Sequence, residues 1–202
     1  MGGECMGAEG TTLVLVAGYA GSGKTELAKL IAAETRWALL DKDTLTRPLV
    51  EAHASLLCGD PDDRQTATYM ERIRPLEYQI LMNTVNEVLD RGTSVVATAP
   101  LIRELRDPNF CDDLADWADI DRVTVRVVWV HADLDTMRRR LTDRGAGRDR
   151  WKLSHWDDYT GTVDMGYRPS VQHDLVDNSL HAGGTLAGHT ALLLRRWREG
   201  SA

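Results

Sequence analysis

Residues 18–25 read GYAGSGKT, which is the complete G-x-x-x-x-G-K-[ST] pattern of a phosphate-binding loop. In such a loop, backbone N–H groups surround a triphosphate while the lysine reaches the outer phosphates and the final hydroxyl ligates Mg²⁺. The pattern therefore assigns a phosphate contact to Lys24 and a metal contact to Thr25. The loop residues expected to bind nucleotide are Gly18, Ala20, Gly21, Ser22, Gly23, Lys24 and Thr25.

The segments on both sides of the loop agree with this interpretation. Residues 11–17 (TTLVLVA) form an apolar run, which is typical of a strand buried on both faces of a parallel sheet. After the loop, Leu27, Leu30 and Ile31 recur at helical spacing. A strand, a glycine-rich loop and a helix N-terminus in this order make an anion-binding site.

The rest of the chain continues the alternation of strands and helices. We predict helices over residues 24–35, 45–57, 75–90, 112–116, 133–144 and 186–198. The predicted strands cover residues 11–17, 37–41, 94–99, 123–131 and 174–176. Alternation of this kind indicates an α/β fold with a parallel sheet that carries helices on both faces.

Length and composition limit the function classes. We expect a loose tail over residues 1–10 and one domain over residues 11–202. The net charge of −7 argues against nucleic acid and membrane surfaces as partners. Cys5, Cys58 and Cys111 show no metal-like spacing, so a reduced, cytoplasmic setting is expected.

A pair of carboxylates follows the second predicted strand. Asp41 and Asp43 flank Lys42 at the carboxyl edge of the sheet, where ligands bind in open α/β folds. A carboxylate there accepts a proton from an attacking hydroxyl or holds the Mg²⁺ shell. We favour Asp43 for the first role and Asp41 for the second, and a solvated turn that caps a helix is the alternative.

A basic segment follows the fifth predicted helix. Arg144, Arg148 and Arg150 lie within seven residues, and Gly145 and Gly147 provide hinge positions. We interpret residues 144–155 as a lid whose arginine stabilises the transferring phosphoryl group, with Arg148 in the catalytic role. Since like charges repel, we expect this lid to stay mobile until a phosphate binds. On the preceding helix, a solvated face is expected for Arg138, Arg139 and Arg140.

The motifs taken in order resemble the P-loop small-molecule kinase superfamily. They are GYAGSGKT, DKD, VVATAPLIREL, VRVVWVHADLDTMRRRLTDRGAGRDR and HDLVDNS. The layout is similar to gluconate kinases, adenylylsulfate kinases, chloramphenicol phosphotransferases and zeta-toxin-like kinases. The resemblance implies the P-loop NTPase fold with a five-stranded parallel sheet, Mg²⁺ and ATP as the donor, and a mobile lid.

The same resemblance implies roles for individual residues. By position, Asp43 resembles the carboxylate that activates the acceptor. Arg144 and Arg148 resemble the lid pair that faces the adenine and the phosphates. Asn178 falls where the loop after the last strand borders the base, and Arg103 falls where acceptor contacts are made.

The acceptor itself is not identified by the sequence. Residues 44–83 form the acceptor-side segment, in which Arg47, Arg72, Arg74 and Tyr78 could hold an anionic acceptor or lie on a solvated surface. The leading hypothesis is an ATP-dependent phosphotransferase acting on a metabolite or antibiotic-like compound, with transfer to a hydroxyl favoured over transfer to a nitrogen. A nucleic-acid 5′-end kinase and a nucleotide-binding regulatory protein without turnover are the alternatives.

Overall fold

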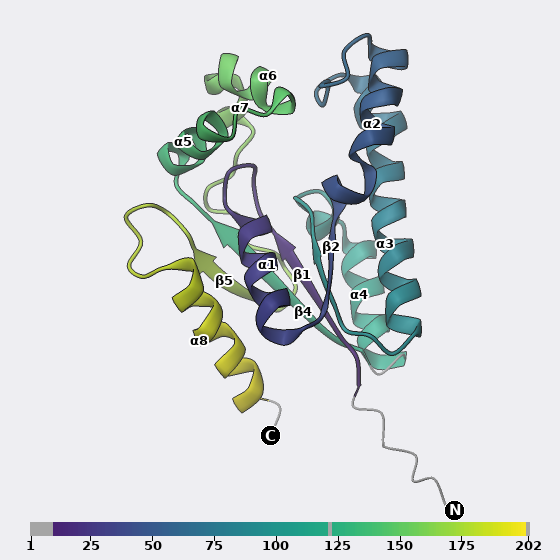
Figure 1. The fold of residues 1–202 in the computed structure, drawn as a ribbon, viewed down its shortest axis with the longest axis vertical. Helices are drawn as coiled ribbons and strands as arrows, with labels where there is room; N and C mark the ends of the chain where they lie inside the picture. The colour runs from purple at the N-terminus through teal and green to yellow at the C-terminus, as the bar shows by residue number, and fades with distance from the viewer. Residues whose placement is uncertain (1–9, 121–122, 201–202) are drawn as a thin grey trace, which may run out of the picture.

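The computed structural model describes residues 10–120 and 123–200. Its centre is a parallel sheet of five strands in the order β2-β3-β1-β4-β5 (Figure 1). The strands are β1 (Thr12–Ala17), β2 (Ala38–Asp41), β3 (Val95–Thr98), β4 (Thr124–His131) and β5 (His173–Asp177). The expected α/β fold and parallel sheet are therefore confirmed.

Helices connect the strands and cover both faces of the sheet. The eight α-helices are α1 (Lys24–Thr35), α2 (Lys42–Cys58), α3 (Arg74–Asp90), α4 (Pro108–Ile120), α5 (Leu134–Arg144), α6 (Arg150–Ser154), α7 (Trp156–Gly161) and α8 (Leu186–Glu199) among the described residues. Three short turns complete the elements: a π-helical turn η1 (Tyr69–Ile73) and the 3₁₀ turns η2 (Glu104–Arg106) and η3 (Gly147–Asp149).

Strand β1 lies at the middle of the sheet and is buried on both faces. Leu13 and Leu15 pack with residues of α3 and α4 on one side, as Leu81 and Leu114 illustrate. Alternate β1 residues belong to a second core on the other face, which α1 and α8 cover. Two cores on opposite faces explain why the strand has no polar alternation.

The structure changes several predicted boundaries. Helix α2 begins at Lys42 and not at residue 45, because the Asp41 side chain accepts a hydrogen bond from Thr44 N and caps the helix. Helix α4 is longer than predicted, and α6 and α7 were not predicted at all. Of the expected tail, residues 1–9 lie outside the described residues.

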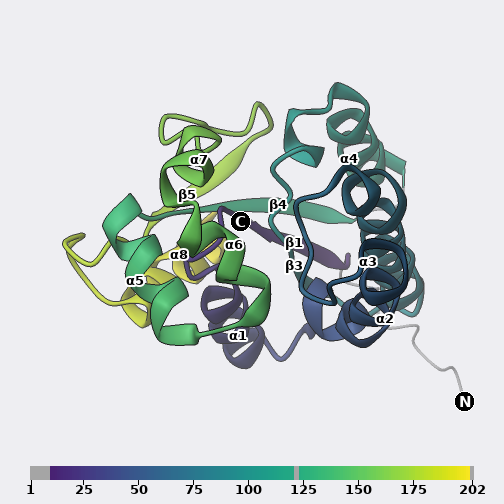
Figure 2. The same ribbon diagram turned by 90° about the horizontal axis from the view of Figure 1, so that it is seen from above.

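The carboxyl ends of the strands point to the end of the molecule where the phosphate loop lies. Helices α5, α6 and α7 lie on one side of this end, and α2 and α3 rise on the other (Figures 1 and 2). The fold thus places the predicted lid opposite the acceptor-side segment. None of the helices in the described ranges has the length and apolar character that a bilayer crossing requires.

Candidate nucleotide and acceptor site

The phosphate loop needs glycine because its backbone is tight and crowded. Gly21 has φ 82°, and a Cβ there would lie 2.8 Å from Met137 O at the start of α5. Gly23 has φ 92°, and its Cβ would overlap the amide of Asn178. Any other residue would force the loop away from α5 and from the end of β5.

Two side chains hold the outer side of the loop through its carbonyl groups. Arg140 donates hydrogen bonds to Gly21 O at 3.3 Å and to Ser22 O at 3.1 Å. Asn178 Nδ2 donates to Ser22 O at 2.8 Å. The backbone carbonyl of Asn178 accepts a hydrogen bond from Arg140 Nη2 at 2.9 Å. These hydrogen bonds hold the loop in place through its carbonyl groups and leave its N–H groups on the other side.

This arrangement corrects one expectation and redirects another. Arg140 was expected on a solvated face together with Arg138 and Arg139, but it is half-buried against the loop. Asn178 was expected beside the base, and here its side chain supports the loop at Gly23. Any contact of Asn178 with a base stays a prediction.

Lys24 and Thr25 occupy the first turn of α1, at the mouth of the loop. Lys24 Nζ lies 3.4 Å from Tyr19 O, to which it donates. Burial lowers the pKa of Lys24 to about 8, although the Asp43 carboxylate opposes this shift. An ammonium whose charged form is disfavoured by its surroundings gains from an anion, as a phosphate binder requires.

The end of β2 and the first turn of α2 bring both predicted carboxylates near the loop. Asp41 Oδ2 accepts a hydrogen bond from the Thr25 hydroxyl at 3.2 Å, while its Oδ1 caps the helix. Asp43 faces the lid, where its Oδ2 lies 3.3 Å from Arg148 Nη2. The two residues thus separate into a loop-side carboxylate and a lid-side carboxylate. Their assignment to Mg²⁺ and to the acceptor proton stays a prediction.

Two cations hold Asp43 in its ionised form. Its Oδ1 lies 3.1 Å from Lys42 Nζ, on the opposite side from Arg148. Burial by itself would raise the pKa of Asp43, but Lys42 and Arg148 outweigh it and lower that pKa to about 2. At neutral pH the group is a carboxylate that can accept a hydrogen bond.

The predicted lid is helical, and its arginines are paired with carboxylates. Arg144 binds the buried Asp149 within the lid, with 2.9 Å from its Nε to Oδ2. Arg150 Nη2 lies 2.7 Å from Asp62 Oδ2, in the acceptor-side segment. The expectation that the three cations repel one another without phosphate is therefore wrong, because Asp43, Asp62 and Asp149 neutralise them.

The lid touches the acceptor-side segment at Gly147. A Cβ at this residue would overlap the Asp62 carboxylate, so with any other residue the Asp62 side chain would have to move. Arg148 and Arg150, which follow this contact in the chain, reach Asp43 and Asp62. In this conformation the lid therefore contacts both the first turn of α2 and the acceptor-side segment.

We expect Gly147→Ala to separate the lid from the acceptor-side segment. The added methyl group displaces Asp62 and breaks its ion pair with Arg150. Hydrogen exchange over residues 144–155 should become faster in the variant than in the wild type, and a non-hydrolysable ATP analogue should slow it less. Mass spectrometry of labelled peptides measures both effects.

The matched control is Gly161→Ala, because a Cβ at Gly161 meets no atom within 4 Å. It should leave exchange in the lid unchanged. Adding Asp62→Ala to Gly147→Ala removes the overlap and should allow binding of the analogue to protect the lid again. Equal exchange in the Gly147→Ala variant and the wild type contradicts the contact.

The predicted acceptor residues do not form one cluster. Arg74 Nη2 lies 2.8 Å from Glu104 Oε1, and the Arg74 guanidinium lies over the Tyr78 ring. Tyr78 is buried, and its hydroxyl accepts from Leu101 N. Arg74 and Tyr78 thus join α3 to the loop after β3, while Arg47 and Arg103 are exposed. Their acceptor contacts stay predictions.

Sequence reasoning missed a buried ion pair beneath Asp43. Lys42 and Glu77 bind each other, and both are nearly inaccessible to solvent. The two residues lie 35 positions apart, so no local pattern identifies them. The inward position of Arg140 had a signal, because it lies one helical turn from the buried Thr136 and Met137.

The donor set fits a Mg²⁺-bound triphosphate. Thr25 and Asp41 supply adjacent oxygens, which suit a hard cation that retains water and phosphate ligands. Ser22 Oγ is buried in the loop without a hydrogen-bond partner. Within the described ranges, no group of three or more His, Cys, Asp or Glu side chains is placed to hold a metal ion.

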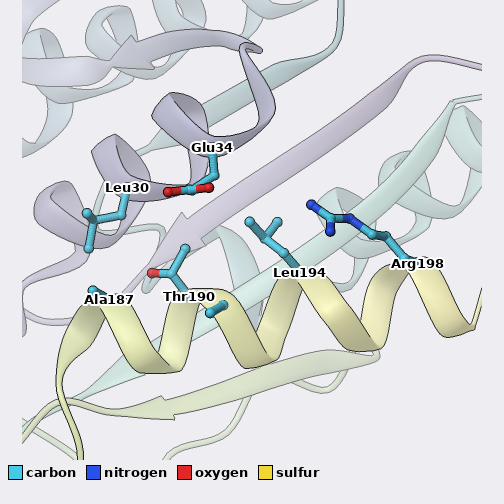
Figure 3. Close-up of a pocket in the computed structure, with 7 residues that line it drawn as sticks. Leu30, Glu34, Ala187, Thr190, Leu194 and Arg198 are labelled. Atoms are coloured by element: carbon cyan, nitrogen blue, oxygen red, sulfur yellow. The ribbon is translucent and has the colours of Figure 1, made fainter.

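A separate pocket of about 200 Å³ lies between α1 and α8 (Figure 3). Leu30 and Glu34 project from α1 toward Thr190 and Leu194 of α8. Its lining residues lie beyond the first turn of α1 and on α8, so it is distinct from the phosphate loop.

Comparisons with solved structures show which fold this is. A sugar kinase from a Janibacter species matches with a TM-score of 0.58 and 17% identity, covering 94% of this chain and 95% of that one. A gluconokinase from Sinorhizobium meliloti matches with a TM-score of 0.54 and 19% identity, covering 96% of this chain and 99% of that one. Shikimate kinase from Acinetobacter baumannii, in complex with shikimate, matches with a TM-score of 0.55 and 16% identity, and the match covers 96% of each chain. At these identities the likeness establishes the P-loop fold.

Sequence comparison gives the family. No curated protein sequence matches the chain. A family model described as "AAA domain" matches residues 13–165, which include the phosphate loop, both site carboxylates and the lid. The chain therefore belongs to the AAA domain family.

Proposed function

We propose that this chain is a phosphotransferase that moves the γ-phosphoryl group of Mg-ATP to a hydroxyl group of a small-molecule acceptor. The observation that carries the proposal is the first turn of α2. There Asp41 contacts Thr25 of the phosphate loop, and Asp43 contacts Arg148 of the lid. The N-cap and first turn of α2 thus contact both the phosphate loop, through Asp41, and the lid arginine Arg148, through Asp43.

On the donor side, the loop N–H groups and Lys24 bind the phosphates of ATP. Thr25 and Asp41 would hold Mg²⁺, which neutralises charge on the phosphate oxygens when it is bound. Arg140 and Asn178 keep the loop in shape through its carbonyls. These residues orient ATP so that its γ-phosphoryl group faces α2.

On the acceptor side, the hydroxyl oxygen attacks the γ-phosphorus and its proton passes to the Asp43 carboxylate. The bond between the γ-phosphorus and the bridging oxygen breaks, and ADP leaves with that oxygen. Negative charge spreads over the equatorial oxygens as this happens, and Arg148 stabilises it. Arg148 changes partner from Asp43 to the phosphoryl group, so the lid and the acceptor carboxylate act together.

The charge of the chain supports a small-molecule acceptor over a polynucleotide. The net charge is −7, and Asp60, Asp62 and Asp63 lie in the segment that meets the lid. Three solved structures of the same fold are described as a sugar kinase, a gluconokinase and shikimate kinase. These descriptions favour hydroxyl acceptors of metabolite size.

The test is a screen for acceptor-dependent release of ADP. Mg-ATP is incubated with sugars, hydroxy acids, nucleosides, aminoglycosides, amino acids and a 5′-hydroxyl oligonucleotide. We expect ADP release to rise with at least one small hydroxyl compound and not with the oligonucleotide. Tight binding of ATP with no acceptor-dependent ADP in any arm indicates a regulatory protein and contradicts the proposal.

Arg148→Ala should lower kcat by about 100-fold and change the KM for ATP little. The arginine acts when charge develops on the transferring group, and Lys24 and the loop still bind ATP. The matched control is Arg139→Ala, which removes an exposed arginine of α5 paired with Asp143 at 3.8 Å. Near-normal turnover in the Arg148→Ala variant contradicts its catalytic role.

A further inference from the structure

A buried ion pair lies directly behind the candidate acceptor carboxylate. Lys42 is 6% exposed and Glu77 is 3% exposed, and the Lys42 ammonium binds Glu77 Oε1. Glu77 also accepts from the Thr46 hydroxyl at 3.3 Å and from the Tyr69 hydroxyl at 2.5 Å. Each oxygen of the buried carboxylate therefore has a donor from the protein.

The same ammonium reaches forward to Asp43. Lys42 Nζ lies 3.1 Å from Asp43 Oδ1, and the Tyr78 ring lies 5.7 Å from it on another side. An ammonium has three donors, and here Glu77 and Asp43 occupy two of them. Because Glu77 is itself held by Tyr69, Lys42 has little freedom to move.

Stability alone gives a weak reason for such a pair. Burying two charges costs free energy that their attraction seldom exceeds, and apolar residues of similar volume are often equally stable. What the pair does provide is a charge at a fixed position, since each partner is held by several hydrogen bonds. That fixed charge is applied to one oxygen of Asp43.

The pair also connects Asp43 to the acceptor-side segment. Tyr69 begins the π-helical turn η1, and Glu77 lies in the first turn of α3. Turns of the π type are frequent at functional sites. Through Glu77, the turn and the acceptor carboxylate share one hydrogen-bonded cluster.

We propose that Lys42 is a positioning residue, held by Glu77 and Tyr69, that fixes the Asp43 carboxylate where it receives the acceptor hydroxyl. This proposal rests on the proposed function. Lys42 pairs with Oδ1 of Asp43, and Arg148 pairs with Oδ2. When Arg148 turns to the phosphoryl group, Lys42 remains as the cation that holds Asp43 in place.

The test separates positioning from stability by removing the charges together. Lys42→Met leaves Glu77 buried and unpaired, so the Tm should fall by about 10 °C. Combining Lys42→Met with Glu77→Gln removes both charges and should restore most of the Tm. In both variants kcat should fall by about 30-fold, with the KM for ATP nearly unchanged. Lys29→Met, which changes an exposed lysine of α1, is the control.

A crystal structure of the double variant provides a readout independent of turnover. We expect the Asp43 carboxylate to leave its wild-type position or to adopt several conformations. A carboxylate that stays in place, or a kcat that recovers together with the Tm, overturns the proposal. If the wild type transfers no phosphoryl group but Asp43 moves in the variant, the proposed function fails and the positioning of Asp43 by Lys42 stands.

Discussion

Replacing Lys24 with alanine is expected to lower kcat by about 1,000-fold or more while the fold stays intact. The lysine follows the γ-phosphoryl group into the transition state, where its charge is most effective. Its loss should not destabilise the chain. Burial lowers the pKa of Lys24 to about 8, which means that the surroundings of the ammonium disfavour its charge.

Turnover is measured with the acceptor found in the screen, and the fold by circular dichroism and thermal unfolding. Lys29→Ala is the control, because Lys29 lies on the same helix, α1, but on its exposed side, with 55% of its side chain accessible. A Lys24→Ala variant that keeps most of its kcat contradicts the assignment of the loop. A greatly lowered Tm in the Lys24→Ala variant would show that Lys24 stabilises the fold, and its loss of turnover would then no longer indicate a phosphate contact.

Asp43→Asn is expected to lower kcat by about 1,000-fold, with a much smaller change in the KM for ATP. The amide keeps the size of the side chain but cannot take up the acceptor proton. It also loses the charge that binds Lys42 and Arg148, at 3.1 Å and 3.3 Å. The effect should therefore appear in the chemical step and not in donor binding.

Asp41→Asn is the comparison that assigns the two carboxylates. Asp41 contacts Thr25, so its loss should raise the Mg²⁺ concentration needed for half-maximal turnover. Full kcat should return at high Mg²⁺ in this variant and not in Asp43→Asn. If the magnesium requirement changes for Asp43→Asn and not for Asp41→Asn, the roles are exchanged. If neither changes turnover, the turn only caps α2.

The sheet could be predicted because its strands are buried on both faces. Residues 12–17 pack against two separate cores, and this leaves an apolar run without alternation. The loop was equally clear, since its glycines occupy positions where a Cβ has no room. Both signals are local. Burial on both faces limits β1 to apolar residues, and crowding limits the loop positions to glycine, so a short stretch of sequence is enough to detect each of them.

The structure of the predicted lid segment could not be read from the sequence. Arg144, Arg148 and Arg150 look like unshielded cations when only neighbouring residues are considered. Two of their carboxylate partners, Asp43 and Asp62, come from distant parts of the chain. In the structure these arginines pair with carboxylates and do not repel one another, and residues 147–154 are helical.

The acceptor side was the least predictable part of the site. Lys42 and Glu77 meet because α2 and α3 pack side by side, and no local pattern links the two residues. Arg74 and Tyr78 were plausible acceptor ligands by type, yet they bind Glu104 and Leu101 N in the structure. Residue types alone do not distinguish a substrate contact from a link between two elements.

The fate of the γ-phosphoryl group tests the central claim most directly. ATP labelled in that group is incubated with Mg²⁺, the protein and the acceptor from the screen, and the products are separated. The account predicts that the label appears as a phosphoester of the acceptor in the wild type and is absent from it in the Lys24→Ala variant. Label found only in inorganic phosphate, or only in unreacted ATP, would contradict it.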